Sequence, residues 1–520
     1  MSKALADLLF PHVVQTPEDF LRAYPPAKGV RMRLAPSPTG QLHIGNLGTA
    51  FLQRMLVNRL GGKMFLRIED TDQKREVEGA VPYMIAGFKE YGIRFDESPV
   101  KPGKYAPYTQ SERIHIYHAF AKRLVERGLA YPCFCTAEQL GAIRERQQAD
   151  KLDTGYYGQF VQCVQLPLNQ VKRKIDDNVP WVLRFNSEGS SVPQTVTWVD
   201  LVRGEMSLPA IKNHPVIIKS GGLPPYNFAH VVDDLLMRTT HVIRTEEWLP
   251  STAEHIQIWR AIAASTNLPQ GTPYQYGHPP VICTEDNGKK RKISKRKDKN
   301  ALVRWFLDVG YPPEAVLEYL LSLYNTNFEK WRIDNPDLPM SQFPVSFEKI
   351  GTNSPLLDMQ KLEHYSRNII AKMTCAQINK AVRDWLRGRD DAQSNAVRQN
   401  FARVAAILAI DRETDKPRKD IAKYSEIYAQ YEYLFAAPSV TVSPQEAQIA
   451  QAYLATYNPA DDKTVWWDKI KALSEQLACK PAVVAMTVRK LLTGREQTPD
   501  LYSVMQVLGA REVVARLNQA

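Results

Sequence analysis

A segment near the amino terminus combines features that bind phosphate groups. Residues 33–46 contain a turn that two prolines and a glycine impose, followed by His43 and Gly45 at the expected start of a helix. The first turn of a helix has unpaired N–H groups and a positive dipole end, and both favour an anion. The segment therefore predicts a site for the phosphates of a nucleotide, with His43 as an additional donor. Taken alone, a histidine in this position is more often a structural cap.

A cationic run occurs later in the chain, at residues 289–299. Within it, Lys292, Ser294 and Lys295 supply two positive charges and a hydroxyl donor. Such groups stabilise the negative charge that develops on a phosphoryl group during its transfer. Basic runs are also common in solvated surface loops, so the run by itself leaves both interpretations open.

Two clusters of carboxylates are further candidates for chemistry. Glu69, Asp70 and Asp72 follow an expected strand, where they could bind an amino group or a metal ion, or cap a helix. Asp233 and Asp234 are adjacent and could form a metal-binding pair. Residue types and spacing do not choose between ligand binding and a structural role at either place.

These groups need a scaffold that brings segments far apart in the sequence together. The residue pattern predicts a strand at 31–35, a helix that ends at Gly61-Gly62, a strand at 64–68 and a helix at 77–91. This order is a βαβ unit, in which a right-handed crossover makes the two strands parallel neighbours. Ligands bind at the carboxyl ends of such strands, where the loop 36–45 is expected to lie.

The rest of the chain divides into two further kinds of structure. Residues 111–223 mix helix and strand signals, and we interpret them as an insertion. The parallel sheet is expected to resume at 215–219 and at 241–244. Beyond residue 345 the apolar periodicity predicts helices throughout.

Composition and charge exclude several classes of protein. With 520 residues, 44% apolar and 24% charged, the chain matches a soluble protein of several domains. No apolar run in the sequence approaches the roughly 18 residues that span a bilayer. The first thirty residues include Asp7, Glu18 and Asp19 and match neither a secretory signal nor a transit peptide, so we expect a cytoplasmic protein with no membrane partner. A net charge of +11 suits a polyanionic partner, but also an ordinary basic surface.

Taken together and in order, these segments resemble the signatures of glutamyl-tRNA synthetases of the bacterial type. Residues 33–46 are similar to the HIGH element of class I synthetases, residues 67–72 to the family's RIEDTD element, and residues 292–296 to the KMSKS element in the form KISKR. Residues 226–234 and 240–248 are similar to the family's YHFANVVDD and THVIRGEEW elements. Beyond about residue 375 the resemblance rests on the all-helical character of the chain.

The resemblance implies an α/β fold in which a Rossmann-type parallel sheet forms the catalytic domain. An inserted acceptor-binding domain and an all-α C-terminal anticodon-binding region accompany it. The expected parts are an N-terminal leader at 1–30, the two halves of the catalytic domain at 31–110 and 224–280, the inserted acceptor-stem-binding domain at 111–223, a KISKR-containing connecting domain at 281–345 and the helical anticodon-binding region at 346–520.

The same resemblance implies an ATP-dependent ligase that joins L-glutamate to tRNA(Glu) through a glutamyl-adenylate and transfers it to the terminal adenosine of the tRNA. ATP and Mg²⁺ are the expected cofactors. The expected partner is tRNA(Glu), with tRNA(Gln) left open as a second, and we expect a monomer. A non-catalytic tRNA-binding protein on the same fold is the alternative, but degeneration would be expected to remove His43 or Lys295, and both are present.

Site residues carry over from the family by position. The expected catalytic residues are His43, Lys292, Ser294 and Lys295; the expected ATP-binding residues are His43, Gly45, Asn46, Glu247, Ile282 and Lys295; the expected glutamate-binding residues are Arg33, Ala35, Ser37, Glu69, Tyr226, His230 and Arg244. Arg244 suits the binding of the glutamate side chain because the planar donors of an arginine pair with a carboxylate through two hydrogen bonds. The chain departs from the family at His230, where asparagine is usual, and at Gly48, where many members carry arginine.

Cys133, Cys135 and Cys163 raise the question of zinc, which some family members bind in the inserted region through a Cys-x-Cys pair and a later cysteine. A closed site needs four ligands. Matching residues 155–158 to the family's tyrosine-glycine element places Phe160, rather than Cys163, at the third ligand, and no fourth ligand follows clearly. We therefore expect no metal site in this chain.

Overall fold

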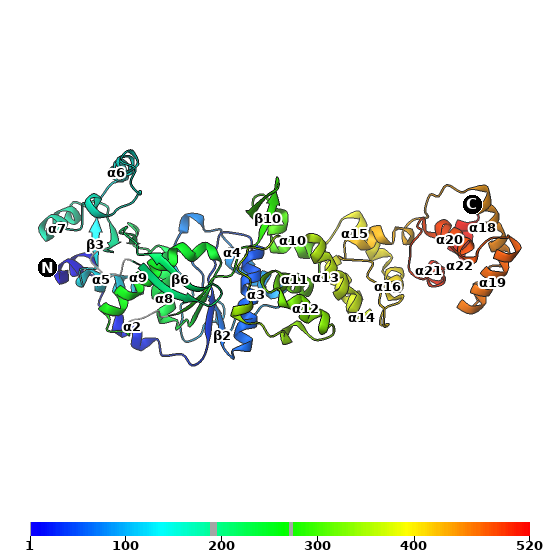
Figure 1. Ribbon diagram of the computed structural model, residues 1–520, viewed down its shortest axis with the longest axis horizontal. Helices are drawn as coiled ribbons and strands as arrows, with labels where there is room; N and C mark the ends of the chain where they lie inside the picture. The colour runs from blue at the N-terminus through cyan, green and yellow to red at the C-terminus, as the bar shows by residue number, and fades with distance from the viewer. Residues whose placement is uncertain (1, 188–194, 270–273, 520) are drawn as a thin grey trace. The chain divides into compact units, whose positions relative to one another are not determined.

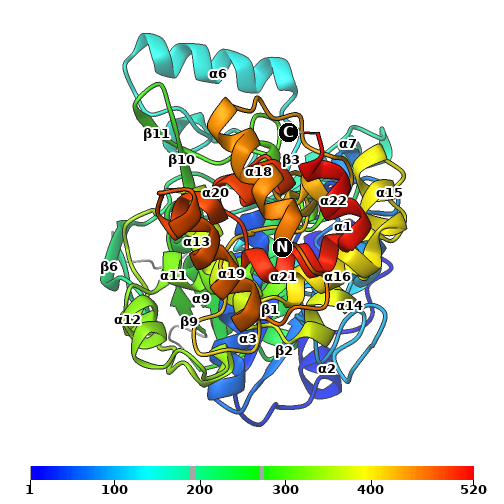
Figure 2. The same cartoon turned by 90° about the vertical axis from the view of Figure 1, so that its right-hand side faces the viewer.

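The structure of the protein is a computed structural model that describes residues 2–187, 195–269 and 274–519 (Figures 1 and 2). The chain forms two compact units. The first comprises Met1–Val303 and Leu320–Leu357, and the second comprises Arg304–Tyr319 and Asp358–Ala520. The first unit contains the sheets, and the second is helical.

A six-stranded sheet forms the centre of the first unit (Figure 1). Its strand order is β2-β1-β8-β9-β5-β6. The strands are β1 (Arg31–Leu34), β2 (Lys63–Leu66), β5 (Thr195–Asp200), β6 (Gly204–Pro209), β8 (His241–Ile243) and β9 (Gln275–Gly277). All neighbours are parallel except the β5–β6 hairpin, which forms an antiparallel edge. All four residues of β1 are buried, as is usual in a mostly parallel sheet.

The expected βαβ unit on one side of this sheet is confirmed. β1 and β2 are parallel neighbours, and α3 (Ile44–Arg59) connects them. α3 begins where His43 caps its first turn and ends just before Gly61, whose φ of +64° suits a glycine. α4 (Ala80–Glu90) follows β2. The loop between β1 and α3 therefore lies at the carboxyl end of the sheet, as the sequence predicts.

The leader forms two helices that belong to the core of the first unit. α1 (Ser2–Leu9) and α2 (Pro17–Ala23) pack on α5 (Ile114–Glu126), and an ion pair of 2.6 Å joins Glu18 to Arg123. α5 in turn packs against α8 (Tyr226–Leu236) and α9 (Leu249–Ser265). Side chains of all five helices share one apolar cluster.

The prediction that the parallel sheet resumes at residues 215–219 is wrong. β7 (Val216–Ile218) pairs antiparallel with β4 (Val182–Phe185), which pairs antiparallel with β3 (Ala130–Cys133), and these three strands form a sheet of their own. Conversely, β5 and β6 come from the expected insertion but join the main sheet. Short apolar strands carry no signal for the direction of their partner, so tertiary pairing decides both cases. α6 (Ala137–Ala149) and α7 (Leu168–Asp176) complete this region.

The cationic run belongs to a β-hairpin and the loop that follows it. β10 (Cys283–Asp286) and β11 (Lys289–Lys292) pair antiparallel around Asn287 and Gly288, whose φ angles are +52° and +73°. An Asn-Gly pair with left-handed backbone is the preferred sequence of a two-residue type I′ turn. α10 (Val303–Asp308), α11 (Pro313–Tyr324) and α12 (Asn327–Asp334) come next in the chain.

The second unit has only helices among its described residues, which confirms the predicted all-α character. After α11 they are α13 (Met359–Lys372), α14 (Cys375–Leu386), α15 (Ala392–Gln399), α16 (Phe401–Ala409), α17 (Glu426–Gln430), α18 (Pro444–Thr456), α19 (Lys463–Gln476), α20 (Pro481–Thr493), α21 (Leu501–Leu508) and α22 (Ala510–Leu517). Capping boxes begin α14 and α18, at Thr374 and Ser443. One apolar cluster connects these helices.

Short 3₁₀ helices link the larger elements. They are η1 (Gln73–Arg75), η2 (Gln110–Arg113), η3 (Gly158–Phe160), η4 (Glu246–Trp248), η5 (Lys299–Ala301), η6 (Met340–Gln342), η7 (Phe347–Lys349) and η8 (Glu432–Leu434). Within residues 2–519, leaving aside the two undescribed segments, no helix has the length and apolar character needed to cross a bilayer.

Candidate active site

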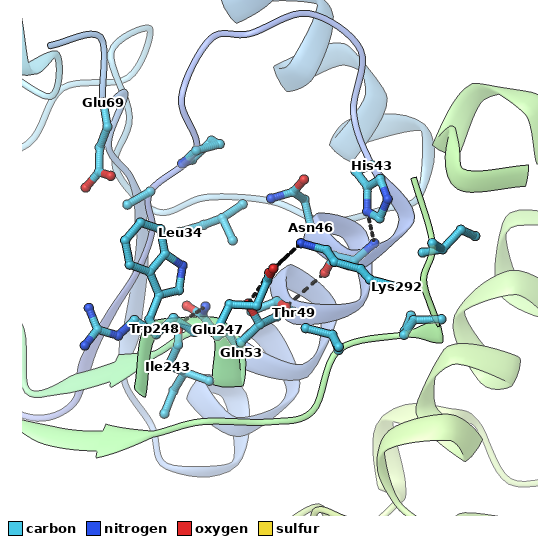
Figure 3. A pocket seen from close by; sticks show the side chains of 18 of the residues that line it. Leu34, His43, Asn46, Thr49, Gln53, Glu69, Ile243, Glu247, Trp248 and Lys292 are labelled. Carbon is cyan, nitrogen blue, oxygen red and sulfur yellow. Dashed lines mark hydrogen bonds and ion pairs between the residues drawn. The ribbon is translucent and has the colours of Figure 1, made fainter. Parts of the chain in front are cut away.

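A cavity of about 590 Å³ lies at the carboxyl ends of β1 and β8 (Figure 3). Its lining includes most residues that the sequence predicts for the site: Arg33, Ala35, His43, Gly45, Asn46, Glu69, Tyr226, Arg244, Glu247, Ile282, Lys292, Ser294 and Lys295. Ser37 and His230 are not part of this lining. Glu69 lies at one end of the cavity, and His43 and Lys292 lie at the other (Figure 3). The fold thus brings the separate motifs together around one space.

His43 caps α3 and lines the cavity at the same time. Its Nδ1 accepts a hydrogen bond from the N–H of Gly45 at 3.0 Å. Burial, together with the charges of Lys295 and Lys292, lowers the pKa of His43 to about 4, so the ring is neutral at physiological pH. Because Nδ1 accepts, the proton of the neutral ring is on Nε2, and the backbone of Ile293 is its hydrogen-bond partner. His43 therefore caps α3 and lines the cavity, and a phosphate would take the place of the Ile293 backbone as the acceptor for Nε2–H.

Lys292 and Lys295 both line the cavity, and each has an oxygen partner. Lys292 Nζ forms an ion pair with Glu247 at 2.5 Å (Figure 3). Lys295 Nζ donates to the backbone carbonyl of Gln41, in the loop that leads to α3. Partial shielding of its ammonium group from solvent lowers the pKa of Lys295. The two cations therefore share the cavity with the first turn of α3.

Arg291 holds the loop that carries Ser294 and Lys295. It binds Asp286 at 2.8 Å and Asp298 through two N–H groups, each also at 2.8 Å. Asp298 in turn accepts a hydrogen bond from the backbone N–H of Ser294 at 2.8 Å. These contacts fix the backbone of the predicted KISKR segment beside the cavity.

Arg244, which follows β8, is held by three side chains. Its Nη1 donates to Tyr226 at 3.2 Å and its Nη2 to Thr252 Oγ1 at 2.9 Å. Its Nε donates to His278 Nε2 at 3.1 Å. Thr252 and His278 could not be predicted from the sequence, since no spacing rule connects α9 or the end of β9 to an arginine after β8. Only the tertiary structure brings them together.

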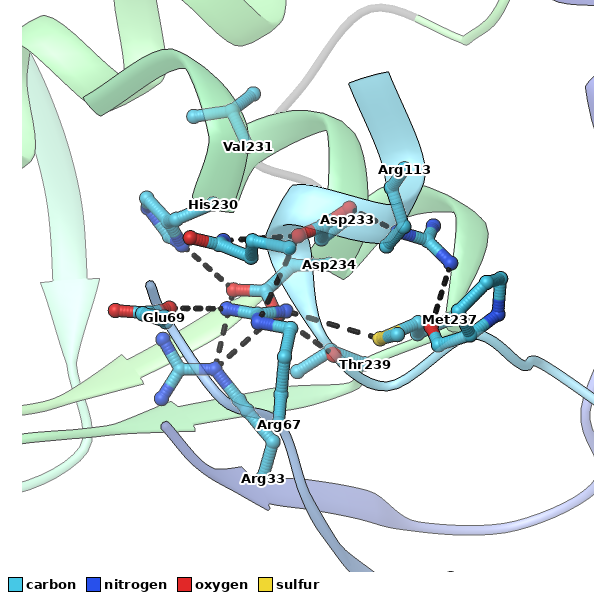
Figure 4. A network of polar contacts seen from close by, with 12 residues as sticks. Arg33, Arg67, Glu69, Arg113, His230, Val231, Asp233, Asp234, Met237 and Thr239 are labelled. Carbon is cyan, nitrogen blue, oxygen red and sulfur yellow. Dashed lines mark hydrogen bonds and ion pairs between the residues drawn. The ribbon is translucent and has the colours of Figure 1, made fainter. Parts of the chain in front are cut away.

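Arg33 and Glu69 belong to a buried network of charges around Asp234 (Figure 4). Arg33 Nε binds Asp234 at 3.1 Å. Arg67 joins the two carboxylates, with Nη1 at 2.6 Å from Asp234 and Nη2 at 2.9 Å from Glu69. Arg67 and Asp234 are fully buried, whereas Arg33 and Glu69 also line the cavity. The buried network therefore fixes the side chains of Arg33 and Glu69, which line the cavity.

Asp233, like Asp234, forms its hydrogen bonds with side chains of the protein. Its carboxylate accepts a hydrogen bond from Arg113 Nε at 2.6 Å (Figure 4). It also accepts hydrogen bonds from Tyr117 at 2.8 Å and Gln110 at 2.9 Å. Arginines thus neutralise both Asp233 and Asp234. The interpretation of the two aspartates as a metal-binding pair is not supported, because their oxygens are already used by protein donors.

Glu69 has an unusual ionisation behaviour for a carboxyl group. Burial raises the pKa of Glu69 to about 7, against the opposing effects of Arg67 and Arg33. A group with this pKa is partly protonated at neutral pH. A cation that binds next to it, such as an ammonium group, favours the ionised form.

The two predicted glutamate contacts outside the cavity lining have other surroundings. His230 is fully buried against Tyr226, with the rings stacked at 5.2 Å, and its Nδ1 lies 2.7 Å from Asp234 Oδ2. Burial lowers the pKa of His230 to about 3, so the ring is neutral and donates to Asp234 from Nδ1. Ser37 belongs to the turn after β1, where its carbonyl accepts from Thr39 at 2.8 Å. His230 therefore supports Tyr226 and Asp234 from beneath the cavity.

The departure from the family at Gly48 has a packing reason. A Cβ atom at this position would lie 2.7 Å from the ring of Tyr324, closer than carbon atoms approach. Tyr324 is buried and lines the cavity. A larger residue at position 48 would displace Tyr324, so the two residues depend on each other.

The cysteines of the inserted region form a cluster that the sequence analysis did not expect. The Sγ atoms of Cys133, Cys135 and Cys163 lie within 4.8 Å of one another. The hydroxyl of Tyr156 lies 3.2 Å from Cys135 Sγ. The fold thus places Cys163 beside Cys133 and Cys135, although matching by spacing puts Phe160 at the position of the third ligand. Three sulfur donors at this spacing fit a tetrahedral zinc ion.

The mostly parallel sheet, the cavity at its carboxyl edge and the helical second unit fit a class I aminoacyl-tRNA synthetase, and two family models identify that class. A family model described as "tRNA synthetases class I (E and Q), catalytic domain" matches residues 29–334. A second model, described as "Anticodon binding domain", matches residues 377–520. The predicted fold class is confirmed.

Individual relatives identify the family more closely. Proteins named "Glutamate--tRNA ligase" from Acetivibrio thermocellus and Clostridium perfringens (strain 13 / Type A) are each 37% identical to this chain, over alignments of 549 positions that cover 99% of both chains. The crystal structure of a glutamate tRNA ligase from Elizabethkingia meningosepticum in complex with its amino acid has a TM-score of 0.78 and 26% identity, over 95% of this chain and 99% of the other. The chain belongs to the glutamate–tRNA ligase family.

Proposed function

We propose that this chain joins L-glutamate to tRNA(Glu) with ATP, through a glutamyl-adenylate. The observation that carries the proposal is that one cavity contains both Arg244 with Glu69 and His43 with Lys295. The first pair fits the carboxylate and ammonium groups of an acidic amino acid, and the second fits the phosphates of a nucleotide. The name and the full-length similarity of the relatives support this assignment.

In the proposed reaction the α-carboxylate of glutamate attacks the α-phosphate of ATP, and pyrophosphate leaves. A ribose hydroxyl of the terminal adenosine of the tRNA then takes the glutamyl group, and AMP leaves. The chain contributes positioning and charge to both steps. Mg²⁺ bound with ATP would neutralise part of the phosphate charge.

On the amino-acid side, Arg33, Tyr226 and Arg244 are assigned to the side-chain carboxylate. All three line the cavity, and Arg244 is fixed by three hydrogen bonds. Glu69 is assigned to the ammonium group, since an ionised carboxylate accepts its hydrogen bonds. Ala35 also lines the cavity, while Ser37 and His230 are outside its lining.

On the nucleotide side, the first turn of α3 is assigned to the phosphates. His43 donates from Nε2, and Gly45 and Asn46 line the cavity beside it. Lys292 exchanges its partner Glu247 for a phosphate oxygen when ATP binds, and Lys295 and Ser294 approach the phosphates from the KISKR loop. Ile282 offers an apolar contact for the adenine ring.

The efficiency of the reaction is expected to fall below neutral pH. Burial raises the pKa of Glu69 to about 7, so this carboxyl group takes up a proton as the pH falls through that value. The protonated group no longer pairs with the ammonium group of glutamate, while glutamate itself does not titrate between about pH 5.5 and 8. kcat/KM for glutamate should therefore decrease by up to about tenfold per pH unit below pH 7.

The variant Glu69→Gln tests this assignment. It should bind glutamate more weakly than the wild type at and above neutral pH, approach the wild type as the pH falls below 7, and lose the acidic limb of the profile, because it carries no titrating group at this position. A flat wild-type profile between about pH 6 and 8, or an unchanged limb in Glu69→Gln, would show that another group controls binding.

We further propose that Cys133, Cys135 and Cys163 bind zinc, which reverses the expectation from the sequence. The protein purified without chelators should contain about one zinc ion per chain by elemental analysis. Cys163→Ala should lose most of this zinc, whereas Cys479→Ala, which changes a thiol of the second unit, should retain it. A wild-type protein that contains no zinc would contradict the proposal.

The proposed function is tested by aminoacylation of purified tRNA(Glu) and tRNA(Gln), and by ATP–pyrophosphate exchange with tRNA present. We expect charging of tRNA(Glu) with glutamate, and charging of tRNA(Gln) would extend the range of partners. Binding of tRNA without exchange or charging would instead favour the non-catalytic alternative. A monomeric state and a cytoplasmic location stay predictions from the sequence.

A further inference from the structure

Three hydrogen bonds fix the guanidinium group of Arg244 and leave two of its N–H groups for a ligand. Nε, Nη1 and Nη2 donate to His278, Tyr226 and Thr252 respectively. An arginine has five N–H groups, so one remains on each terminal nitrogen beyond these contacts with described residues. Two N–H groups on the two terminal nitrogens are what an end-on, bidentate contact with a carboxylate needs. The bond at Nε also prevents the alternative, side-on contact.

The bond at Nε requires His278 to be in one particular tautomer. Nε–H of arginine is only a donor, so Nε2 of His278 must accept. Its other ring nitrogen, Nδ1, lies 2.5 Å from Asp200 Oδ2. Asp200 and His278 are both buried, and an ionised carboxylate can only accept. Asp200 therefore keeps the proton of the ring on Nδ1 and the lone pair of Nε2 directed at Arg244.

Ionisation supports the same arrangement. Burial opposes the charged form of Asp200, but hydrogen bonds from the His278 ring and from backbone N–H groups hold the pKa of Asp200 below its usual value. Burial, and then the nearby charge of Arg244, lower the pKa of His278 to about 4. At neutral pH the pair is therefore a carboxylate and a neutral imidazole, and the unprotonated Nε2 accepts from Arg244 Nε at 3.1 Å, with Thr252 Oγ1 further away at 3.3 Å.

The sheet determines the distance between these groups. Asp200 is the last residue of β5, and it pairs in parallel register with Tyr276 of β9, two residues before His278. The two oxygens of Asp200 have separate tasks. Oδ1 accepts from the backbone N–H groups of Val202, Arg203 and His278 at 3.0 to 3.2 Å, and Oδ2 accepts from the His278 ring. The turn and the ring can therefore be perturbed separately.

We propose that Asp200 and His278 are positioning residues that hold Arg244 in the orientation that distinguishes glutamate from glutamine. The proposal rests on the assignment of Arg244 to the side-chain carboxylate. A carboxylate offers two acceptors to the two remaining N–H groups, whereas a carboxamide offers one acceptor and one N–H₂ donor, which the arginine repels. If Nε of Arg244 loses its acceptor, the guanidinium can rotate and this distinction weakens.

Asp200→Asn is the decisive variant, because it keeps the shape and the Oδ1 acceptor of the turn. Its side-chain N–H₂ faces Nδ1 of His278 and favours the other tautomer, which turns an N–H toward Nε–H of Arg244. We expect KM for glutamate to rise by about tenfold or more, with KM for ATP and kcat changed by less than about threefold. The ratio of kcat/KM for glutamate to that for glutamine should fall. His278→Asn, which removes the acceptor at Nε2, should have the same effects if Asp200→Asn folds poorly.

Two further variants make the result unambiguous. Asp96→Asn is the matched control, because Asp96 also binds a backbone N–H, that of Met64, and one side chain, Arg54, each at 2.8 Å, at the β2 edge of the sheet. It should leave both KM values unchanged. Arg244→Lys tests the assignment beneath the proposal: if it does not raise KM for glutamate, the proposed function of Arg244 fails. If Arg244→Lys raises KM while folded Asp200→Asn and His278→Asn change neither KM nor the glutamine ratio, or lower kcat alone, the positioning role is refuted.

Discussion

Replacing Lys295 with alanine is expected to slow the activation of glutamate by about 10- to 100-fold, with little change in the affinity for tRNA. Lys295 lines the cavity, and its ammonium group is held beside the loop that leads to α3. In the proposed reaction its charge stabilises the phosphates while pyrophosphate leaves. The residue lies in a loop at the surface, outside the apolar core, so its truncation should leave the fold intact.

The measurement is the rate of ATP–pyrophosphate exchange with saturating tRNA, together with the dissociation constant for tRNA. Lys297→Ala is the matched control: Lys297 belongs to the same cationic run but not to the lining of the cavity. It should retain nearly the full exchange rate. An unaffected rate in Lys295→Ala would refute the catalytic assignment, and an equal loss in both variants would indicate that only the total charge of the run matters.

Asp233→Asn is expected to lower the free energy of unfolding of the first unit by about 3 to 5 kcal/mol. The substitution keeps the shape of the side chain but removes its charge. Arg113, which is fully buried and lies 2.6 Å from the carboxylate, would then have no carboxylate partner there. The new N–H₂ group would also face donors from Tyr117 and Gln110, because all the partners of Asp233 are donors. The loss therefore combines an unpaired buried charge with a mismatched hydrogen-bond network.

Thermal and denaturant unfolding of the full chain would measure this loss. The transition should be monitored with a probe in the first unit, since the two units need not unfold together. Asp150→Asn is the control. Asp150 faces Arg146 across an exposed ion pair of 3.8 Å, which should contribute little to stability. The same unfolding midpoint for Asp233→Asn and the wild type would show that the buried network does not stabilise the fold as its geometry implies.

Local patterns in the sequence were sufficient for the elements that carry the motifs. The βαβ unit around residues 31–91 follows from periodicity and from the glycines that end its helix. Asn287 and Gly288 form the turn of the β10–β11 hairpin because their backbone preference is intrinsic to the two residue types. Capping residues such as Thr374 and Ser443 likewise begin their helices through contacts within one turn.

The pairing of the strands and the buried residues that hold the site could not be predicted from local sequence patterns. β7, which is short and apolar, pairs antiparallel in a small sheet, and β5, which alternates polar and apolar residues, joins the main sheet. Neither pattern specifies its partner strand. His230 was assigned to the substrate by its position in a motif, yet it lies outside the cavity lining and stacks against Tyr226. Cys163 reaches the other two cysteines through the folding of residues 136–162, which no alignment by spacing reproduces.

The sequence by itself determined the order of the motifs, the chemistry of the residues at the two ends of the cavity, and the helical character of the second unit. These properties depend on residue type and on contacts within a few positions. Only the tertiary structure decided which groups hold Arg244, Arg33 and Glu69 in place. Asp200 and His278 lie far from Arg244 in sequence, and the parallel register of β5, β8 and β9 brings them within hydrogen-bonding distance. Asp234 is 201 residues from Arg33, and the packing of α8 on the sheet brings these two together. Such register depends on the packing of the whole unit, which no local pattern encodes.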